Sequence, residues 1–270
     1  MVDGARESLV INRSIPRSHW LHFSFVVTLA AFLFLSSPAS ANDNWLYPVK
    51  EIAKARAKEV IIRDKRERII ARVDGGQMLH LYAVMTALRE VAEVQTEFYI
   101  TGGKQPNAWA CPECPIGEKP EDRMSSGNRW NKKEDEQQEP TDVKPNVVAI
   151  NMGMLELFES DMHEAAAIIG HELAHLKLKH GEKSQEQHEK QQRSGGNVFS
   201  AAGTRFSRDH EREADYLGVI WSIEAGYDPA AAARVHEKLY KLPKGGFGGS
   251  HPSSIERITV LKSLARRLAR

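Results

Sequence analysis

The residues with the clearest chemical potential lie in the segment IIGHELAHLKLKHG, where His171 and His175 are four positions apart. Side chains four residues apart on an α-helix share one face, with Cβ atoms about 5–6 Å apart. Two imidazoles on that face can bind one metal ion, at about 2.0–2.1 Å if the ion is zinc. Glu172 lies beside them, where a carboxylate can take a proton from a water that the ion activates. The pattern therefore indicates a hydrolytic metal site, and a helix with solvated histidines is the alternative.

A catalytic zinc ion takes three protein ligands and leaves one position to water, so this site needs a third ligand. The segment HEREAD supplies Glu211, with Asp215 four residues later on the same predicted helix. The small residues Ala214 and Gly218 beside them allow two helices to approach closely. We therefore expect Glu211 to complete a His-His-Glu site and Asp215 to support a ligand histidine. Glu213 is expected to be a solvated charge.

Three blocks of the sequence, HELAH, SRDHEREAD and HPSSIERI, together resemble the signature of one zinc peptidase family. That family includes HtpX, the Oma proteases, the CAAX prenyl proteases and the periplasmic BepA-type quality-control proteases. The resemblance covers roughly residues 98–257. It implies one zinc ion per subunit, bound by His171, His175 and Glu211. It also implies that Glu172 is the general base.

The same resemblance assigns roles outside the ligand set. It implies that His251 and Arg257 act as a C-terminal pair. It also implies that Asp215 contacts a metal-binding residue rather than the metal itself. His251 is the candidate for stabilising the developing oxyanion, or for contacting the metal in the resting enzyme; a simple helix start at this position is the alternative. The segment PNAWA, residues 106–110, is similar to the strand that borders the family's cleft. Its substrate-edge candidates are Ala108, Trp109 and Ala110.

These features predict a zinc-dependent metalloendopeptidase that acts through a metal-activated water. The predicted substrates are unfolded or misassembled envelope proteins, as in protein quality control. One alternative is a zinc-bound, chaperone-like assembly factor with little proteolytic turnover, and another is a metal-free structural relative. A third alternative is thiol redox chemistry.

The first 41 residues have the three-part layout of a secretory signal peptide. Arginines precede an apolar run, Phe23–Leu35, and an A-x-A site ends at Ala41. The run is shorter than the roughly 20 residues of a membrane-spanning helix, so cleavage after Ala41 is expected. The predicted location is the periplasm, with secretion or an uncleaved membrane anchor as alternatives, and proximity to a membrane surface as a further option. Without residues 1–41, 34 basic and 34 acidic side chains remain, which gives no argument for binding to nucleic acid.

The sequence also contains cysteines and further histidines, which are residue types that can bind metals. Cys111 and Cys114 form the segment CPEC, which in a reducing compartment could be half a zinc site or a redox pair. The predicted export favours a disulfide between them instead. His163, His180 and His188 are expected to be solvated.

The expected elements give an α+β fold that is mostly helical, with residues 42–270 as a single domain. Helices are expected over 48–73, 78–94, 160–181, 210–226, 228–242 and the C-terminal segment, and short strands around 98–101 and 146–151. The resemblance implies a zincin-type metallopeptidase domain with a small β-sheet beside the active-site helix. Residues 112–145 and 182–208 are polar and are expected to be flexible insertions, which either restrict the cleft to unfolded chains or are only solvated.

Overall fold

A computed structural model describes residues 8–10, 45–63, 67–114, 144–193, 201–243 and 254–268. The strands are β1 (Ser8–Val10), β2 (Leu46–Pro48), β3 (Glu59–Arg63), β4 (Ile69–Asp74), β5 (Glu97–Thr101), β6 (Ala108–Cys111) and β7 (Val147–Asn151). The helices are α1 (Val49–Ala55), α2 (Gly75–Ala92), α4 (Met152–Phe158), α5 (Met162–Lys177), α6 (His180–Arg193), α7 (Ala201–Glu224), α8 (Ala231–Lys241) and α9 (Ile255–Leu268). The predicted leader apart from β1, His251, and residues 115–143 lie outside the described residues.

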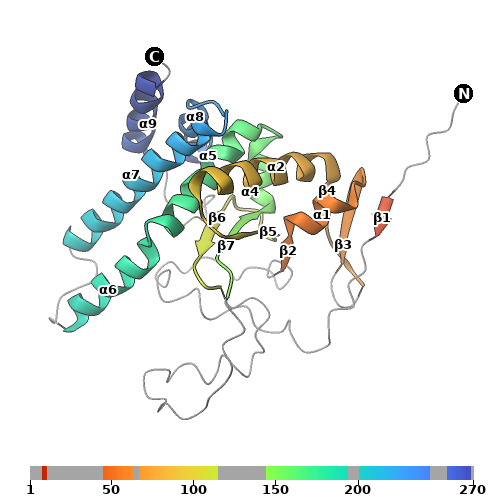
Figure 1. The fold of residues 1–270 in the computed structure, drawn as a ribbon, viewed down its shortest axis with the longest axis horizontal. Coiled ribbons are helices and arrows are strands. Elements are labelled where there is room, and N and C mark those ends of the chain that lie inside the picture. Colours follow the sequence, from red (N-terminus) through yellow and green to blue (C-terminus); the bar gives the residue numbers. More distant parts are fainter. Residues whose placement is uncertain are drawn as a thin grey trace, which may run out of the picture.

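The site-bearing half of the molecule is built on a four-stranded sheet with the order β2-β5-β7-β6. β5 and β7 are parallel, whereas β2 and β6 run antiparallel to their neighbours. All five residues of the inner strand β7 are buried, which explains its almost continuous apolar run VVAI. β6 lies at the edge of this sheet and contacts α5. Strands β1, β3 and β4 form a separate small sheet (Figure 1).

Helix α5 is the central element of the core. Asp161 caps its N-terminus, accepting hydrogen bonds from the amides of His163 and Glu164 at 2.9 and 3.2 Å. Residues 164–174 of this helix are all buried. α2 and α7 pack against α5, and α5 also contacts β6 and β7, so it lies between the other helices and the sheet (Figure 1). Its polar side chains are therefore held in a rigid, mostly apolar environment.

The prediction of one helix over 48–73 is wrong. The helix α1 ends at Ala55, and β3 and β4 follow as an antiparallel pair. The three β-branched residues Val60, Ile61 and Ile62 are buried in β3, where such side chains pack well but would lose rotamer freedom in a helix. The glycines after Asp74 do not end a helix either, because Asp74 caps α2 by accepting a 2.7 Å hydrogen bond from the amide of Gln77.

The expectation of a flexible insertion over 182–208 is also wrong for the residues that are described. α6 covers residues 180–193, and α7 begins at Ala201. α6 is polar almost all round, and ion pairs one turn apart help to stabilise such a helix. Two such pairs are Glu186 with Lys190 and Glu189 with Arg193. The helix predicted over residues 160–181 is α5, which ends at Lys177 rather than near Gly181.

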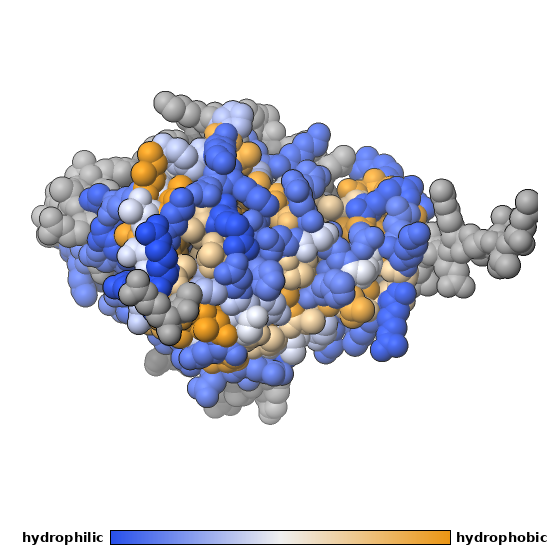
Figure 2. All heavy atoms as spheres, turned by 90° about the horizontal axis from the view of Figure 1, so that it is seen from above, coloured by the Kyte–Doolittle hydropathy of each residue, from blue (hydrophilic) through white to orange (hydrophobic). Residues whose placement is uncertain are grey.

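The surface is mainly hydrophilic on the face seen in Figure 2, where apolar residues form separated patches. Among the described residues, no helix combines the length and apolar character that crossing a membrane requires.

Candidate metal centre

The centre lies where α5 and α7 cross with their backbones in direct contact. A Cβ atom on Gly170 would lie 2.8 Å from the carbonyl oxygen of Gly218, and one on Gly218 would lie 2.7 Å from the amide nitrogen of His171. These distances are too short for any side chain, so both positions require glycine for this approach. The expected close approach at Gly218 is therefore present, and Gly170 is its counterpart on α5.

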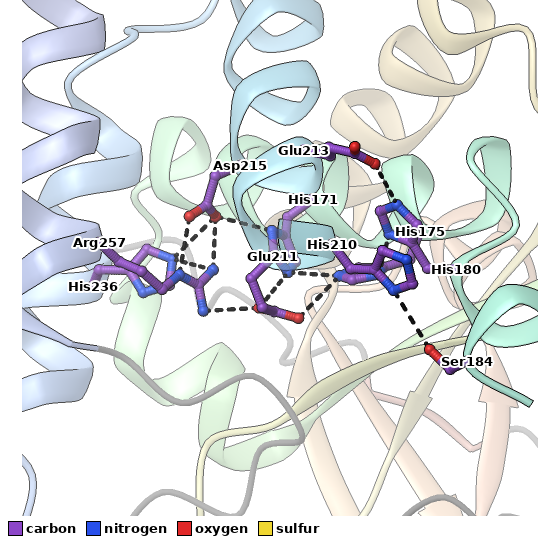
Figure 3. Close-up of polar contacts among 10 residues, drawn as sticks. All are labelled: His171, His175, His180, Ser184, His210, Glu211, Glu213, Asp215, His236 and Arg257. Atoms are coloured by element: carbon purple, nitrogen blue, oxygen red, sulfur yellow. Dashed lines mark hydrogen bonds and ion pairs between the residues drawn. The ribbon is translucent and has the colours of Figure 1, made fainter. Parts of the chain in front are cut away.

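The crossing brings His171 and His175 of α5 together with Glu211 of α7. The two Nε2 atoms are 3.0 Å apart. Glu211 Oε2 is 3.5 Å from His171 Nε2, and Glu211 Oε1 is 3.5 Å from His175 Nε2. Ligands placed about 2.0–2.1 Å from a tetrahedral ion lie roughly 3.3–3.4 Å from one another, so this triangle has the size of a zinc site. Among the described residues, it is the group of His, Cys, Asp and Glu side chains that could hold a metal (Figure 3).

Behind this triangle, Asp215 and Arg257 orient its members. His171 Nδ1 lies at ion-pair distance, 3.0 Å, from Asp215 Oδ1, while its Nε2 faces Glu211. Arg257 donates to both oxygens of Asp215, at 2.9 Å from Nε and 2.6 Å from one terminal nitrogen. Its other terminal nitrogen lies 2.9 Å from Glu211 Oε2. One guanidinium on α9 therefore positions two carboxylates of α7.

The local charge also fits a divalent cation. Glu172 is only 2 % exposed, and Glu211 and Asp215 are nearly buried as well. Arg257 is the buried cation that faces them, so three carboxylates and one guanidinium leave a formal charge of minus two when the histidines are neutral. Buried charges are costly unless they are compensated, and a Zn²⁺ ion would compensate these two.

The same electrostatics set the protonation of His171 and Asp215. Burial alone would lower the pKa of His171, but its hydrogen bonds to Asp215 and Glu211 raise that pKa to about 10. Burial would raise the pKa of Asp215, yet the hydrogen bond from His171 and the charge of Arg257 lower it strongly. The space between the carboxylates of Asp215 and Glu211, where the ring of His171 lies, thus favours a positive charge. A proton or a metal ion can supply that charge.

His236 of α8 was not predicted from the sequence. Its Nε2 lies 3.3 Å from a terminal nitrogen of Arg257, and since a guanidinium has no acceptor, His236 accepts this hydrogen bond. Burial, reinforced by the charge of Arg257, lowers the pKa of His236 to about 3, so the ring stays neutral. A lone histidine on the buried face of a helix gives no specific sequence signal for this role.

His180 was predicted to be solvated, and that prediction is wrong, whereas Glu213 is exposed as predicted. His180 is 3 % exposed, and its Nδ1 lies 2.9 Å from Nδ1 of His175. Its Nε2 lies 3.1 Å from Oε2 of Glu213, whose side chain is 56 % exposed. Burial lowers the pKa of His180, although Glu213 opposes this effect. Both residues belong to the polar network around the candidate ligands (Figure 3).

Strand β6 carries the substrate-edge candidates Ala108, Trp109 and Ala110, and it pairs antiparallel with β7. Cys111 at its end is joined to Cys114 by a disulfide, as expected. A hollow of about 50 Å³ opens between the end of β6 and the turn after α5. Its lining residues are Ala110, Pro112, His175, Leu176, Lys179, Gly181 and Glu182. The candidate metal centre is thus flanked by an edge strand and a small depression.

Comparison with known proteins gives two matches. Residues 142–265 match the model of peptidase family M48. A 130-residue stretch, 42 % of the chain, is 34 % identical to a protein of Arabidopsis thaliana described as mitochondrial metalloendopeptidase OMA1. The match spans 27 % of that relative's length. The M48 match includes both crossing helices and all three candidate ligands.

Proposed function

Because residues 142–265 match the model of peptidase family M48, we propose that the chain is a zinc-dependent metalloendopeptidase. The observation that carries this proposal is the convergence of His171, His175 and Glu211 within 4.8 Å of one another. Glu172, buried on the same helix, supplies the carboxylate that such chemistry needs. The matched relative, whose printed name is a metalloendopeptidase, supports the same class of activity.

In this proposal His171, His175 and Glu211 hold one zinc ion. The ion, when bound, polarises the scissile carbonyl and lowers the pKa of a nearby water toward about 7. Glu172 takes the proton from the attacking water and later passes it to the leaving amine. Asp215 and Arg257 hold His171 and Glu211 in place during these steps. His251, outside the described residues, is proposed to stabilise the developing oxyanion.

We further propose that the substrate is an extended polypeptide added along the edge of β6. Such strand addition gives main-chain hydrogen bonds, and pockets for alternate side chains give selectivity. The hollow beside His175 and Ala110 is small, so it suits a small side chain. This geometry favours unfolded segments, because a folded protein rarely exposes an extended strand of its own.

A role in quality control of envelope proteins in the periplasm is the finer proposal. It is supported by the leader-like pattern of residues 1–41 and by the disulfide between Cys111 and Cys114, a bond typical of oxidising compartments. Fractionation of cells that express the full chain checks the location. Identification of envelope proteins that accumulate with an inactive variant checks the substrate class.

The central test compares wild type with Glu172→Gln on unfolded casein. The variant should keep one zinc ion per chain and lose about 10²–10⁴-fold in kcat, because the base is gone while the ligands remain. Glu186→Gln, on the exposed face of α6, is the matched control and should cleave normally. A chelator should abolish wild-type cleavage, and added zinc should restore it. Equal cleavage by Glu172→Gln and wild type would refute the assigned base.

A zinc-bound assembly factor with little turnover is the second candidate. It predicts zinc in the purified chain, no cleavage of casein by wild type, and suppression of aggregation of unfolded proteins. A chain that binds no zinc would exclude both candidates.

A further inference from the structure

From Nδ1 of His175, a series of polar contacts runs through His180 to Glu213. It is separate from the contact between His171 and Asp215. His180 Nδ1 faces His175 Nδ1 at 2.9 Å, and His180 Nε2 faces Glu213 Oε2 at 3.1 Å. The ring of His180 also stacks on His210 of α7, with centroids 4.1 Å apart and an angle of 7° between the planes. His180 is thus held between a candidate ligand and the helix that carries Glu211 (Figure 3).

The donor and acceptor in each of these contacts follow from Glu213, the exposed end of the series. A carboxylate only accepts hydrogen bonds, so His180 Nε2–H donates to Glu213. A neutral His180 then offers a lone pair on Nδ1, which accepts from Nδ1–H of His175. Neutral His175 is left with its lone pair on Nε2, the atom that faces Glu211 and His171. This hydrogen-bonded series therefore selects the tautomer of His175 that can bind an ion together with His171 and Glu211.

A break in the helix makes this contact available. His180 follows His175 by five positions, which on a continuous helix would rotate it by about 140° away from that face. Instead α5 ends at Lys177, and Lys179 adopts a left-handed conformation with φ 55°. α6 then starts at His180 and turns its ring back onto His175. The turn thus presents His180 to the centre from a different helix.

We propose that His180 and Glu213 are positioning residues that fix the tautomer and orientation of His175 for metal binding. The proposal rests on the proposed function, since it assigns a role toward the zinc ion held by His171, His175 and Glu211. The two ligand histidines are then supported unequally. His171 is backed directly by a buried carboxylate, whereas His175 is backed by a neutral imidazole that leads to the exposed Glu213.

The test measures zinc affinity of the full chain by competition with a chelator. His180→Phe keeps a ring that can stack on His210 but removes both hydrogen bonds, and it should weaken zinc binding by about 10–100-fold. His180→Asn keeps an acceptor close to the position of Nδ1 and should bind with intermediate affinity. His188→Phe, elsewhere on α6, is the matched control and should bind like wild type. Unchanged affinity in His180→Phe would overturn the proposal.

A second measurement does not require bound zinc. Nitrogen-15 spectra of histidine-labelled, metal-free wild type should show His175 protonated on Nδ1. In Glu213→Leu, which alters only an exposed side chain and should fold normally, this preference should weaken. A metal-free His175 protonated on Nε2 in wild type would refute the inference. If wild type binds no zinc, the proposed function fails instead, whatever the tautomer of His175.

Discussion

At the residue scale, Arg257 connects the parts of the candidate centre. It pairs with Asp215 and Glu211 and donates to His236, so it joins side chains from α7, α8 and α9. A bidentate guanidinium suits this position better than an ammonium, because its planar fork matches the carboxylate geometry. The basic residue of the HPSSIERI block, Arg257, therefore contacts the candidate ligand Glu211 directly as well as Asp215.

Replacing Arg257 should destabilise the fold as well as the site. Arg257→Met leaves the buried carboxylates without their cation, and we expect a loss of about 3–5 kcal/mol in the free energy of unfolding. Urea unfolding of the metal-free chain measures this loss. Arg212→Met removes the exposed pair with Glu256, whose side chains are 51 % and 57 % exposed, and should have little effect. Similar losses in both variants would contradict the structural role given to Arg257.

At the element scale, the centre depends on how two helices cross and on where one of them ends. The contact between Gly170 and Gly218 sets the distance between α5 and α7, and hence the distance from His171 to Glu211. The turn at Lys179 ends α5 early enough for His180 to return toward His175. Both features are backbone properties that side-chain substitutions at the ligands would not reveal.

A larger side chain at the crossing of α5 and α7 should move the candidate ligands apart without replacing any of them. In Gly218→Ala the new Cβ would lie 2.7 Å from the amide nitrogen of His171, so the helices must move apart. We expect a loss of about 1–3 kcal/mol in stability together with weaker zinc binding. Gly181→Ala is the control, because its Cβ would meet only Pro112 Cγ at 4.0 Å. Thermal unfolding and chelator competition on both variants test this expectation, and wild-type zinc affinity in Gly218→Ala would refute it.

At the scale of the whole molecule, the sheet places an edge strand beside the helix that carries the candidate ligands. The disulfide between Cys111 and Cys114 closes a tight turn at the end of β6, and Cys114 is buried in a small apolar cluster with Tyr99 and Val147. The cysteine pair therefore belongs to the sheet edge, and its expected role is structural.

Replacing both cysteines should preserve chemistry while lowering stability. The Cys111→Ser/Cys114→Ser variant loses a short closed loop, which corresponds to about 2 kcal/mol in the chain-entropy estimate. It should keep its zinc and still cleave casein. The measurement pairs thermal unfolding with the casein assay, and wild type treated with a reductant is the matched control. Loss of cleavage with full zinc content would instead indicate that the thiol pair or the edge strand takes part in turnover.

Much of the candidate centre was predictable because it depends on local periodicity. His171 and His175 share a helix face by their spacing, and Glu211 and Asp215 do so on the second helix. The β-strand at residues 147–151 was recognisable from its apolar run. The region 48–73 was misassigned because residues that favour helices flank the β-branched run of β3, and only pairing with β4 decides between the two structures.

Residue types and a four-residue spacing specify the type of chemistry, because they fix which atoms can share one face of a helix. Which side chains surround those atoms depends instead on contacts between elements far apart in the sequence. His180, Glu213 and His236 reach the centre through a helix break and through contacts between helices far apart in the chain. Their roles depend on distances and burial that no spacing along the chain encodes, because these arise when the helices pack.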